Sequence, residues 1–350
     1  MAKGVFHSKS TKTSIIGIII RLAILIALVY GFLYAQSNYI VCSDIVYENQ
    51  IIPKNFVGYK IVQISDVCNK PMNTYDIINK IQPDLVVFTG NLSDKNGRFN
   101  KSVDLINKVS KSYQSVYVLG ELDENQYDDI IRELDKSNAE NLISETFTIK
   151  PKDITVDKFI DTYIEKWYRK NEDDPDSYIH RYIEYVKKDF EEDKDKHIRL
   201  IGLDLCDSDT DFIDYICRFI DLDDEEFRLV VASQSQYAED ISQNDVQIIL
   251  TGNTFGVDRF NNEYSKGIYY SNNTMISISA GLGENPDGSA RFLNFPQVIS
   301  ITLSDGTINT DNPLQKLLAR LIPNIENRFS GDAGFSEYTY EYSSDKKQQQ

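Results

Sequence analysis

Short polar residues follow several apolar runs of this sequence, and carboxylates and amides are prominent among them. Asp66 comes directly after the run YKIVQIS, Asn91 follows DLVVFTG, and Glu121 follows SVYVLG. In open α/β sheets the ligand-binding groups lie just past the carboxyl ends of the strands, where the loops meet. Oxygen atoms of such side chains suit hard cations such as Mg²⁺ or Ca²⁺. The sequence therefore predicts one polar site, with candidate members Asp66, Cys68, Asn91, Glu121, Ser233 and Asn253.

Histidine is scarce in the chain. There are three histidines in 350 residues, His7, His180 and His197, and none of them follows one of the apolar runs. Catalytic sites for zinc, iron or manganese normally use imidazole ligands. This distribution argues against a transition-metal centre.

The apolar runs are short, and amphipathic segments separate them, which is typical of α/β folds. Several runs are apolar throughout, as strands covered on both faces tend to be. The predicted strands span residues 59–65, 84–89, 115–119, 199–203, 228–232, 246–251, 274–280 and 298–303.

Residues 151–196 interrupt this alternation. Apolar and aromatic residues recur there at helical spacing in two sets, which predicts a helical hairpin with one apolar stripe on each helix. Such stripes most often form only the seam between the two helices. Two short helices cannot bury so much aromatic surface alone, however, so part of the stripe could dock on another membrane or surface protein. The candidate partner-binding residues are Phe159, Tyr163, Trp167 and Tyr182.

The N-terminal part of the chain predicts a membrane anchor. Residues 14–36 form an apolar run long enough to cross a bilayer as one helix. Lys3, Lys9 and Lys12 precede it without an acidic residue, so the positive-inside rule places residues 1–13 in the cytoplasm and the main domain outside the cell membrane. A cleaved signal peptide is the alternative, although its apolar region is usually about 7–15 residues long.

The remaining segments and the overall charge complete this division. We expect a connector at 37–56, the folded domain at 57–310, a C-terminal helix at 311–323 and a disordered polar tail at 324–350. The formal net charge is −17. Because nucleic-acid backbones attract basic surfaces and repel acidic ones, the composition argues against a nucleic-acid partner.

Five segments in sequence order resemble the calcineurin-like metallophosphoesterase superfamily, especially its branch with one N-terminal membrane anchor. Tyr59–Asn69 resembles the strand that ends in Asp-x-His, and Pro83–Asp94 resembles the PDLVVxTGDxxD segment. Val116–Asp123 resembles the strand before Gly-Asn-His-Asp/Glu, Val246–Gly256 the one before Gly-His-x-His-Gly, and Ser279–Leu303 the closing SxGLG…RxxNxP segment. The resemblance implies an α/β fold, a four-layer αββα sandwich of two packed mixed sheets flanked by helices, after one N-terminal transmembrane helix.

The metal-binding positions depart from the family pattern. The resemblance implies two metal ions bridged by an aspartate, and that position is Asn91 here. The first motif keeps its aspartate as Asp66 but has Cys68 in place of histidine, and the catalytic histidine of the third motif is Leu122. The other former ligand positions hold Glu121, Ser233, Asn253 and Phe255.

These departures weaken a two-metal centre on electrostatic grounds. Two divalent ions about 3.5–4 Å apart repel each other by about 18 kcal/mol at an effective dielectric constant near 20. A bridging carboxylate offsets much of this repulsion, and the neutral side chain of Asn91 does not. The side chain of Leu122 cannot transfer a proton. We therefore expect no catalytic residue at this site.

The resulting hypothesis is a membrane-anchored, extracytoplasmic phosphoesterase-fold protein that is catalytically inactive and acts as a binding module, with no cofactor expected. The alternative is a divergent metal-dependent hydrolase that uses one loosely held Mg²⁺ or Ca²⁺ ion near Asp66, Cys68, Asn91 and Glu121. A third reading leaves these residues with structural roles only, because short polar residues commonly cap helices and bind loop amides.

Overall fold

The chain folds around two six-stranded mixed β-sheets. The computed structural model describes residues 11–151, 155–163, 178–203, 226–256, 265–287, 291 and 294–306. The first sheet has the order β1-β12-β2-β3-β4-β5, formed by Val41–Glu48, Gln297–Ser304, Lys60–Ile64, Leu85–Thr89, Gln114–Val118 and Glu140–Asn141. The second has the order β10-β11-β9-β8-β7-β6, formed by Gly267–Ser271, Thr274–Ile278, Ile248–Gly252, Phe227–Gln234, Ile198–Leu203 and Thr146–Ile149.

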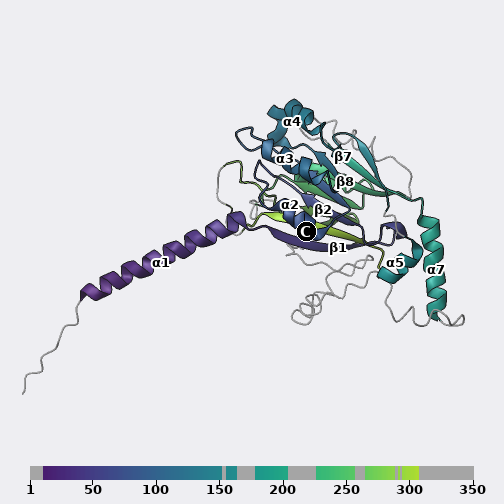
Figure 1. Cartoon of the computed structure of the whole chain (residues 1–350), viewed down its shortest axis with the longest axis horizontal. Helices are drawn as coiled ribbons and strands as arrows, with labels where there is room; N and C mark the ends of the chain where they lie inside the picture. The colour runs from purple at the N-terminus through teal and green to yellow at the C-terminus, as the bar shows by residue number, and fades with distance from the viewer. Residues whose placement is uncertain are drawn as a thin grey trace, which may run out of the picture.

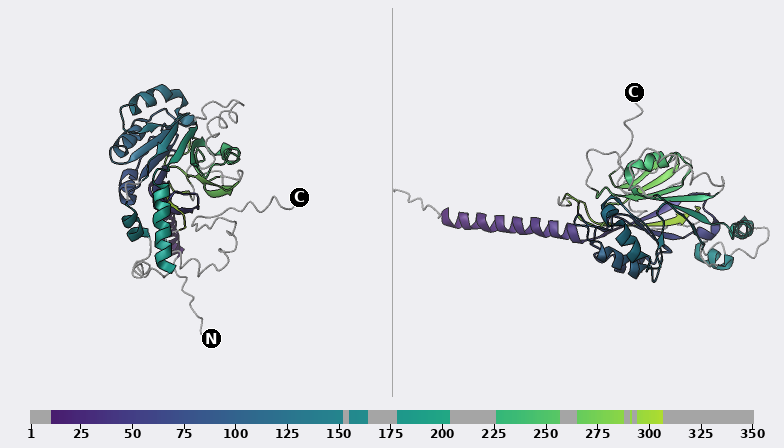
Figure 2. Two further views of the ribbon diagram at one scale, coloured as in Figure 1. Left: turned by 90° about the vertical axis from the view of Figure 1, so that its right-hand side faces the viewer. Right: turned by 90° about the horizontal axis from the view of Figure 1, so that it is seen from above.

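Helices cover the outer faces of both sheets and give a four-layer arrangement (Figures 1 and 2). Side chains of α2, α3 and α4 pack with the outer face of the first sheet, and α9 packs with the outer face of the second. These helices span Thr74–Ile81, Asn100–Val109, Tyr127–Leu134 and Ala238–Ile241. The expected αββα sandwich is confirmed.

The main hydrophobic core lies between the two sheets. Val87 and Val116 of the first sheet belong to the same buried cluster as Leu229 and Leu250 of the second. Because these strands are also covered on their outer faces, they are apolar throughout, which is why their sequences could be recognised as strands.

The part of the chain that the structure describes contains all eight predicted strands and four that were not predicted. β1 lies inside residues 37–56, where a connector was expected, and pairs in parallel with β12 from Val41↔Gln297 to Glu48↔Ser304. The folded domain therefore begins before residue 57. β5, β6 and β10 were also missed. The segments 311–323 and 324–350 lie outside the described residues.

The hairpin of residues 151–196 contains α5, Val156–Tyr163, and α7, Tyr178–Asp193. Phe159 is 0% exposed and belongs to the main core, together with Phe190 of α7, whose ring lies 5.4 Å from it. Asn55, in a 3₁₀ turn at Lys54–Phe56, donates its side-chain N–H groups to carbonyls at the end of α7, including that of Asp193 at 2.6 Å. The apolar stripe thus packs against the chain's own domain, which corrects the expectation that Phe159 lies on a partner-binding surface. Tyr163 and Tyr182 lie in these helices without a described side chain, and Trp167 lies outside the described residues.

The first helix, α1, spans Thr11–Asn38 and extends away from the domain (Figure 1). Its segment Gly17–Tyr34 is long and apolar enough to cross a membrane, and none of it is buried in the described protein. A signal sequence would have the same character.

Candidate functional site

The candidate site lies at the carboxyl ends of β2, β3, β4 and β9, where the sequence placed it. Asp66, Cys68, Asn91 and Asn253 all have positive φ angles, between 46° and 61°. Aspartate and asparagine enter this left-handed region readily, whereas for other residues it costs about 1–2 kcal/mol. The loop backbone is therefore held in the left-handed conformation at each of these four former ligand positions.

Gly120 explains part of this path. A Cβ atom at Gly120 would lie 2.4 Å from the Oδ1 atom of Asn91, so the backbone after β4 can approach the loop after β3 only because glycine has no side chain. This close approach brings the backbone N–H of Leu122 to 3.0 Å from the same Oδ1 atom.

The hydrogen bond from Leu122 determines which way the amide of Asn91 faces. A backbone N–H can only donate, so Oδ1 must face it and the NH₂ group must point the other way. There the Nδ2 atom of Asn91 donates to Oδ1 of Asp66 at 2.8 Å and to Oδ1 of Asn253 at 2.8 Å. Both N–H bonds of the amide thus point to neighbouring oxygens in the centre of the site.

Asn253 extends this network to the protein surface. Its backbone N–H lies 3.2 Å from both carboxylate oxygens of Asp66. Its Nδ2 atom donates to Oε2 of Glu121 at 3.3 Å, and Glu121 is exposed. Asp66, Asn91, Asn253 and Glu121 therefore form one continuous chain of hydrogen bonds in which they bind one another.

Asp66 is the most perturbed carboxylate in this network. It is fully buried, and burial raises its pKa from 3.8 to about 6. The hydrogen bond from Asn91, the nearby charge of Arg291 and the N–H of Asn253 each oppose this rise without cancelling it. The charge of Asp66 is therefore only partly compensated by its surroundings.

Arg291 was not singled out as a site residue, although it lies in the RxxNxP segment. Arg291 is 5% exposed, and its guanidinium donates to the carbonyls of Gly283 at 2.7 Å, Gly281 at 3.2 Å and Ala280 at 2.8 Å. The N–H of Gly283 in turn donates to the carbonyl of Asp66 at 2.6 Å. Arg291 thus holds the 280–283 loop against Asp66.

Cys68 lies under the same loop and is 6% exposed. Burial raises its pKa well above its ordinary value, and the negative charges of Asp66 and Asp123 add to this effect. Only a thiolate is a good metal ligand or nucleophile. The Cys68 thiol therefore stays protonated at neutral pH and suits neither role.

Asp123, at the end of the third motif, is a second buried carboxylate, and the sequence did not predict its role. It is 0% exposed, and its carboxylate accepts hydrogen bonds from the backbone N–H groups of Leu92, Ser93 and Gly120 at 3.0, 2.7 and 3.0 Å. It ties the loop after β3 to the loop after β4. Because these bonds go to the backbone, Asp123 fixes the shape of the site rather than presenting oxygens to a ligand.

The remaining former ligand and catalytic positions provide no strong metal ligand. Ser233 is 0% exposed, and its hydroxyl has no hydrogen-bond partner among the described residues. Phe255 is 6% exposed, and Leu122 is half-buried. Neither of these last two side chains can bind an ion or carry a proton.

A pair of divalent cations does not fit these residues. A cation among Asp66, Asn91 and Asn253 would face the two N–H bonds of Asn91. Turning that amide over would set its oxygen against two other oxygens and leave the Leu122 N–H without its acceptor. Within the described ranges, no group of three or more His, Cys, Asp or Glu side chains could hold a metal ion.

The comparisons with known proteins give a partial sequence match to a metallophosphoesterase. No protein-family model matches the chain. Over 109 residues it is 28% identical to the uncharacterized metallophosphoesterase YkuE of Bacillus subtilis strain 168, covering 28% of this chain and 38% of that protein. This partial match is to a metallophosphoesterase, the superfamily that the sequence motifs resemble. The chain matches less than half the length of YkuE, so the relationship does not carry an activity with it.

Two solved structures are also similar to this phosphoesterase-like chain. TT1561 of Thermus thermophilus has a TM-score of 0.37 and 10% identity, over 65% of this chain and 91% of that one. A dimetal phosphatase from Danio rerio has a TM-score of 0.36 and 9% identity, over 66% and 90%. Similarity at these scores carries no conclusion about this chain, and the chemistry of the site has to be derived from the chain's own residues.

Proposed function

We propose that this protein is a membrane-anchored, extracytoplasmic phosphoesterase-fold domain that has lost two-metal catalysis and acts by binding. The observation that carries the proposal is the orientation of Asn91. Its NH₂ group occupies the centre of the site and stabilises the carboxylate of Asp66 by a hydrogen bond, a role that metal ions would fill in a bimetallic enzyme.

The anchor supports the localisation. α1 provides one apolar segment of membrane-spanning length, and the lysines before residue 14 favour a cytoplasmic N-terminus. With this topology the domain that follows α1 lies outside the cell.

The alternative of a hydrolase with one hard cation has less support. Such an ion would need several oxygens that converge on one point. Of the two carboxylates in the network, Asp66 is engaged by Asn91 and Asn253, and Glu121 is exposed at the other end.

The test is metal analysis of the purified full-length chain after exposure to Mn²⁺, Zn²⁺, Mg²⁺ and Ca²⁺, with hydrolysis assays on generic phosphomonoesters and phosphodiesters. We expect less than one tightly bound ion per chain and no turnover above the rate of an Asp66→Ala variant. Two retained transition-metal ions per chain would overturn the proposal. Turnover with Mg²⁺ or Ca²⁺ that is lost in Asp66→Ala would instead establish the one-cation hydrolase.

Among the described side chains of the hairpin, those on its outer face are open to a partner. Tyr185 of α7 is 60% exposed, whereas the inner stripe is occupied by the domain's own core. A partner captured through residues 151–196 should therefore depend on Tyr185 and not on Phe159.

A further inference from the structure

The membrane helix is joined to the domain without a flexible spacer. α1 ends at Asn38 and β1 begins at Val41. Gln36, still in α1, is 0% exposed, and Ile40 is 7% exposed in the same hydrophobic cluster as Val67 and Leu282 of the candidate site. The ring of Tyr39 lies 6.5 Å from that of Phe295 in an edge-on contact. The end of α1 is therefore packed onto the domain.

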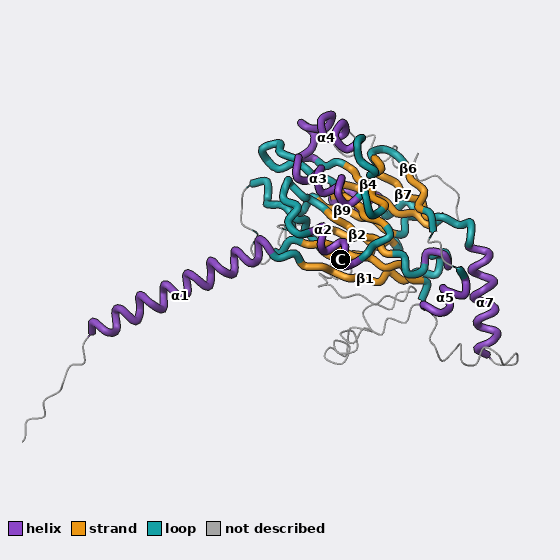
Figure 3. The backbone as a smooth tube through the Cα atoms, in the orientation of Figure 1, coloured by secondary structure: helices purple, strands orange, loops and turns teal. Residues whose placement is uncertain are grey.

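Strand register places the candidate site at this same end. β1 runs parallel to β12, with Val41 beside Gln297, and β12 runs antiparallel to β2, with Ile299 beside Gln63. The start of β1 therefore lies level with the carboxyl end of β2. Because β12 lies between them, the two strands are about 10 Å apart. Figures 1 and 3 show α1 leaving the domain at the end opposite to α5 and α7.

The distance from the bilayer follows from helix geometry. The apolar segment ends at Tyr34, two positions before the buried Gln36, and each helical residue adds about 1.5 Å. The headgroup region extends about 5–8 Å beyond the hydrocarbon core on each side. If α1 spans the membrane, the loops after β2 and β3 lie in or directly above the headgroups.

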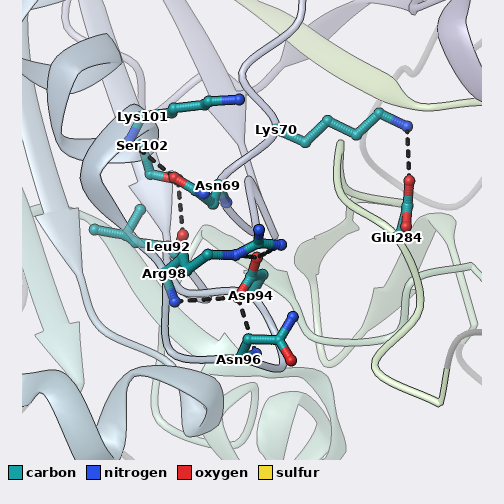
Figure 4. Close-up of polar contacts among 9 residues, drawn as sticks. All are labelled: Asn69, Lys70, Leu92, Asp94, Asn96, Arg98, Lys101, Ser102 and Glu284. Carbon is teal, nitrogen blue, oxygen red and sulfur yellow. Dashed lines mark hydrogen bonds and ion pairs between the residues drawn. The ribbon is translucent and has the colours of Figure 1, made fainter.

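These loops are basic in an otherwise acidic chain. Residues 69–73 and 94–102 contain four basic residues, Lys70, Lys95, Arg98 and Lys101, and one acidic residue, Asp94, whereas the whole chain has a net charge of −17. Figure 4 shows Lys70, Arg98 and Lys101 around Asn69.

Ion pairs with acidic residues do not balance the positive charge of these four side chains. Arg98 pairs with Asp94 at 2.6 Å, and Lys70 lies 3.4 Å from Glu284, whose side chain is 77% exposed. Lys95 and Lys101 are both exposed, and neither forms an ion pair among the described residues. Lys101 also lies in the first turn of α3, where the helix dipole adds partial positive charge.

We propose that this basic rim, formed by Lys70, Lys95, Arg98 and Lys101, binds the phosphates of anionic lipid headgroups in the membrane that α1 spans. Lysine and arginine are the side chains that recognise phosphate, and a basic segment beside a membrane helix is attracted to an anionic surface. The rim would hold the carboxyl ends of the strands against the bilayer, so that any ligand of the candidate site reaches it from the membrane surface. The proposal rests on the anchor in the proposed function and not on the loss of metals.

The test uses the full-length chain in nanodiscs of phosphatidylcholine alone or of phosphatidylcholine with phosphatidylglycerol. Amide hydrogen exchange of residues 69–73 and 94–102 is the readout. We expect exchange to slow by at least about tenfold in the anionic discs. Lys95 and Lys101, which form no ion pair among the described residues, contribute about 1 kcal/mol each near such a surface, and tenfold corresponds to about 1.4 kcal/mol. Lys95→Gln/Lys101→Gln should abolish most of this slowing. The charge-matched control, Lys188→Gln/Lys194→Gln at the opposite end of the domain, should retain it.

Several outcomes would overturn the proposal. Equal exchange in both kinds of disc, or slowing that survives Lys95→Gln/Lys101→Gln, would exclude the rim as a lipid site. The same slowing by soluble glycerol phosphate in zwitterionic discs would assign the rim to a free phosphate ester. If the mass of the purified chain shows that α1 has been cleaved off, the protein has no membrane anchor and the lipid proposal is overturned. Two bound metal ions would overturn only the non-catalytic function.

Discussion

Replacing Asp66 with asparagine should stabilise the domain, and the effect should depend on pH. The substitution keeps the shape of the side chain, and one oxygen can still accept the hydrogen bond from Asn91. It removes a buried charge whose pKa burial raises to about 6 from 3.8. A metal ligand needed for function would behave in the opposite way in the presence of its metal.

The sign follows from linkage between protonation and folding. The native state holds the proton of Asp66 more tightly than the unfolded chain does, so this group's contribution to stability is complete below about pH 4 and is lost as the pH rises to about 6 and above. A shift of about two pKa units corresponds to about 3 kcal/mol. Asparagine does not titrate. The Asp66→Asn variant should therefore gain about 3 kcal/mol relative to the natural chain between about pH 4 and pH 7.

The assay is urea unfolding of the full-length chain in detergent micelles across this pH range. Near-UV circular dichroism is the suitable signal, since it reports the packing of the domain's tyrosines and not the helicity of α1. Asp104→Asn, at an exposed position in the interior of α3, is the matched control and should change the free energy of unfolding by less than about 0.5 kcal/mol across the range. A constant difference between Asp66→Asn and the natural chain across the range, or a loss of stability at neutral pH, would refute the reasoning.

Four further substitutions test the same structure. Asn91→Asp would set two carboxylates about 3 Å apart, so it should lower the free energy of unfolding at pH 7 by about 2–4 kcal/mol. Added Mn²⁺ should restore part of this loss. An unchanged free energy of unfolding would contradict the hydrogen-bond network around Asp66. Arg291→Lys should lower the free energy of unfolding by about 2–3 kcal/mol, because one ammonium group cannot donate to all three carbonyls in the same geometry. The pH dependence of stability due to Asp66 should remain. Thermal unfolding of the variant at two pH values separates these effects. Phe159→Ala should cost about 3–5 kcal/mol as a core truncation, whereas Tyr185→Ala, at a 60% exposed position, should change stability by less than about 0.5 kcal/mol. Equal losses for the last two would show that the hairpin is not packed on the core.

The sequence by itself determined the strands of both sheets that are buried on two faces, because an uninterrupted apolar run such as LVVFT in β3 carries its own signal. It also determined which ligand positions had changed, since Asn91, Cys68 and Leu122 follow recognisable strands. These are local properties. They can be recognised from neighbouring residues without knowing what the segment packs against.

Only the tertiary structure decided how the site is satisfied and where it faces. The orientation of the Asn91 amide depends on the N–H of Leu122, and the role of Arg291 depends on three carbonyls of a loop earlier in the chain. β1 was missed because its place in the sheet comes from pairing with β12, near the other end of the chain. The burial of Phe159 likewise requires the core of the domain. Contacts between segments far apart in sequence produce no periodic pattern in either segment. Here those contacts decide whether the polar side chains of the site are available to an ion or are hydrogen-bonded to one another.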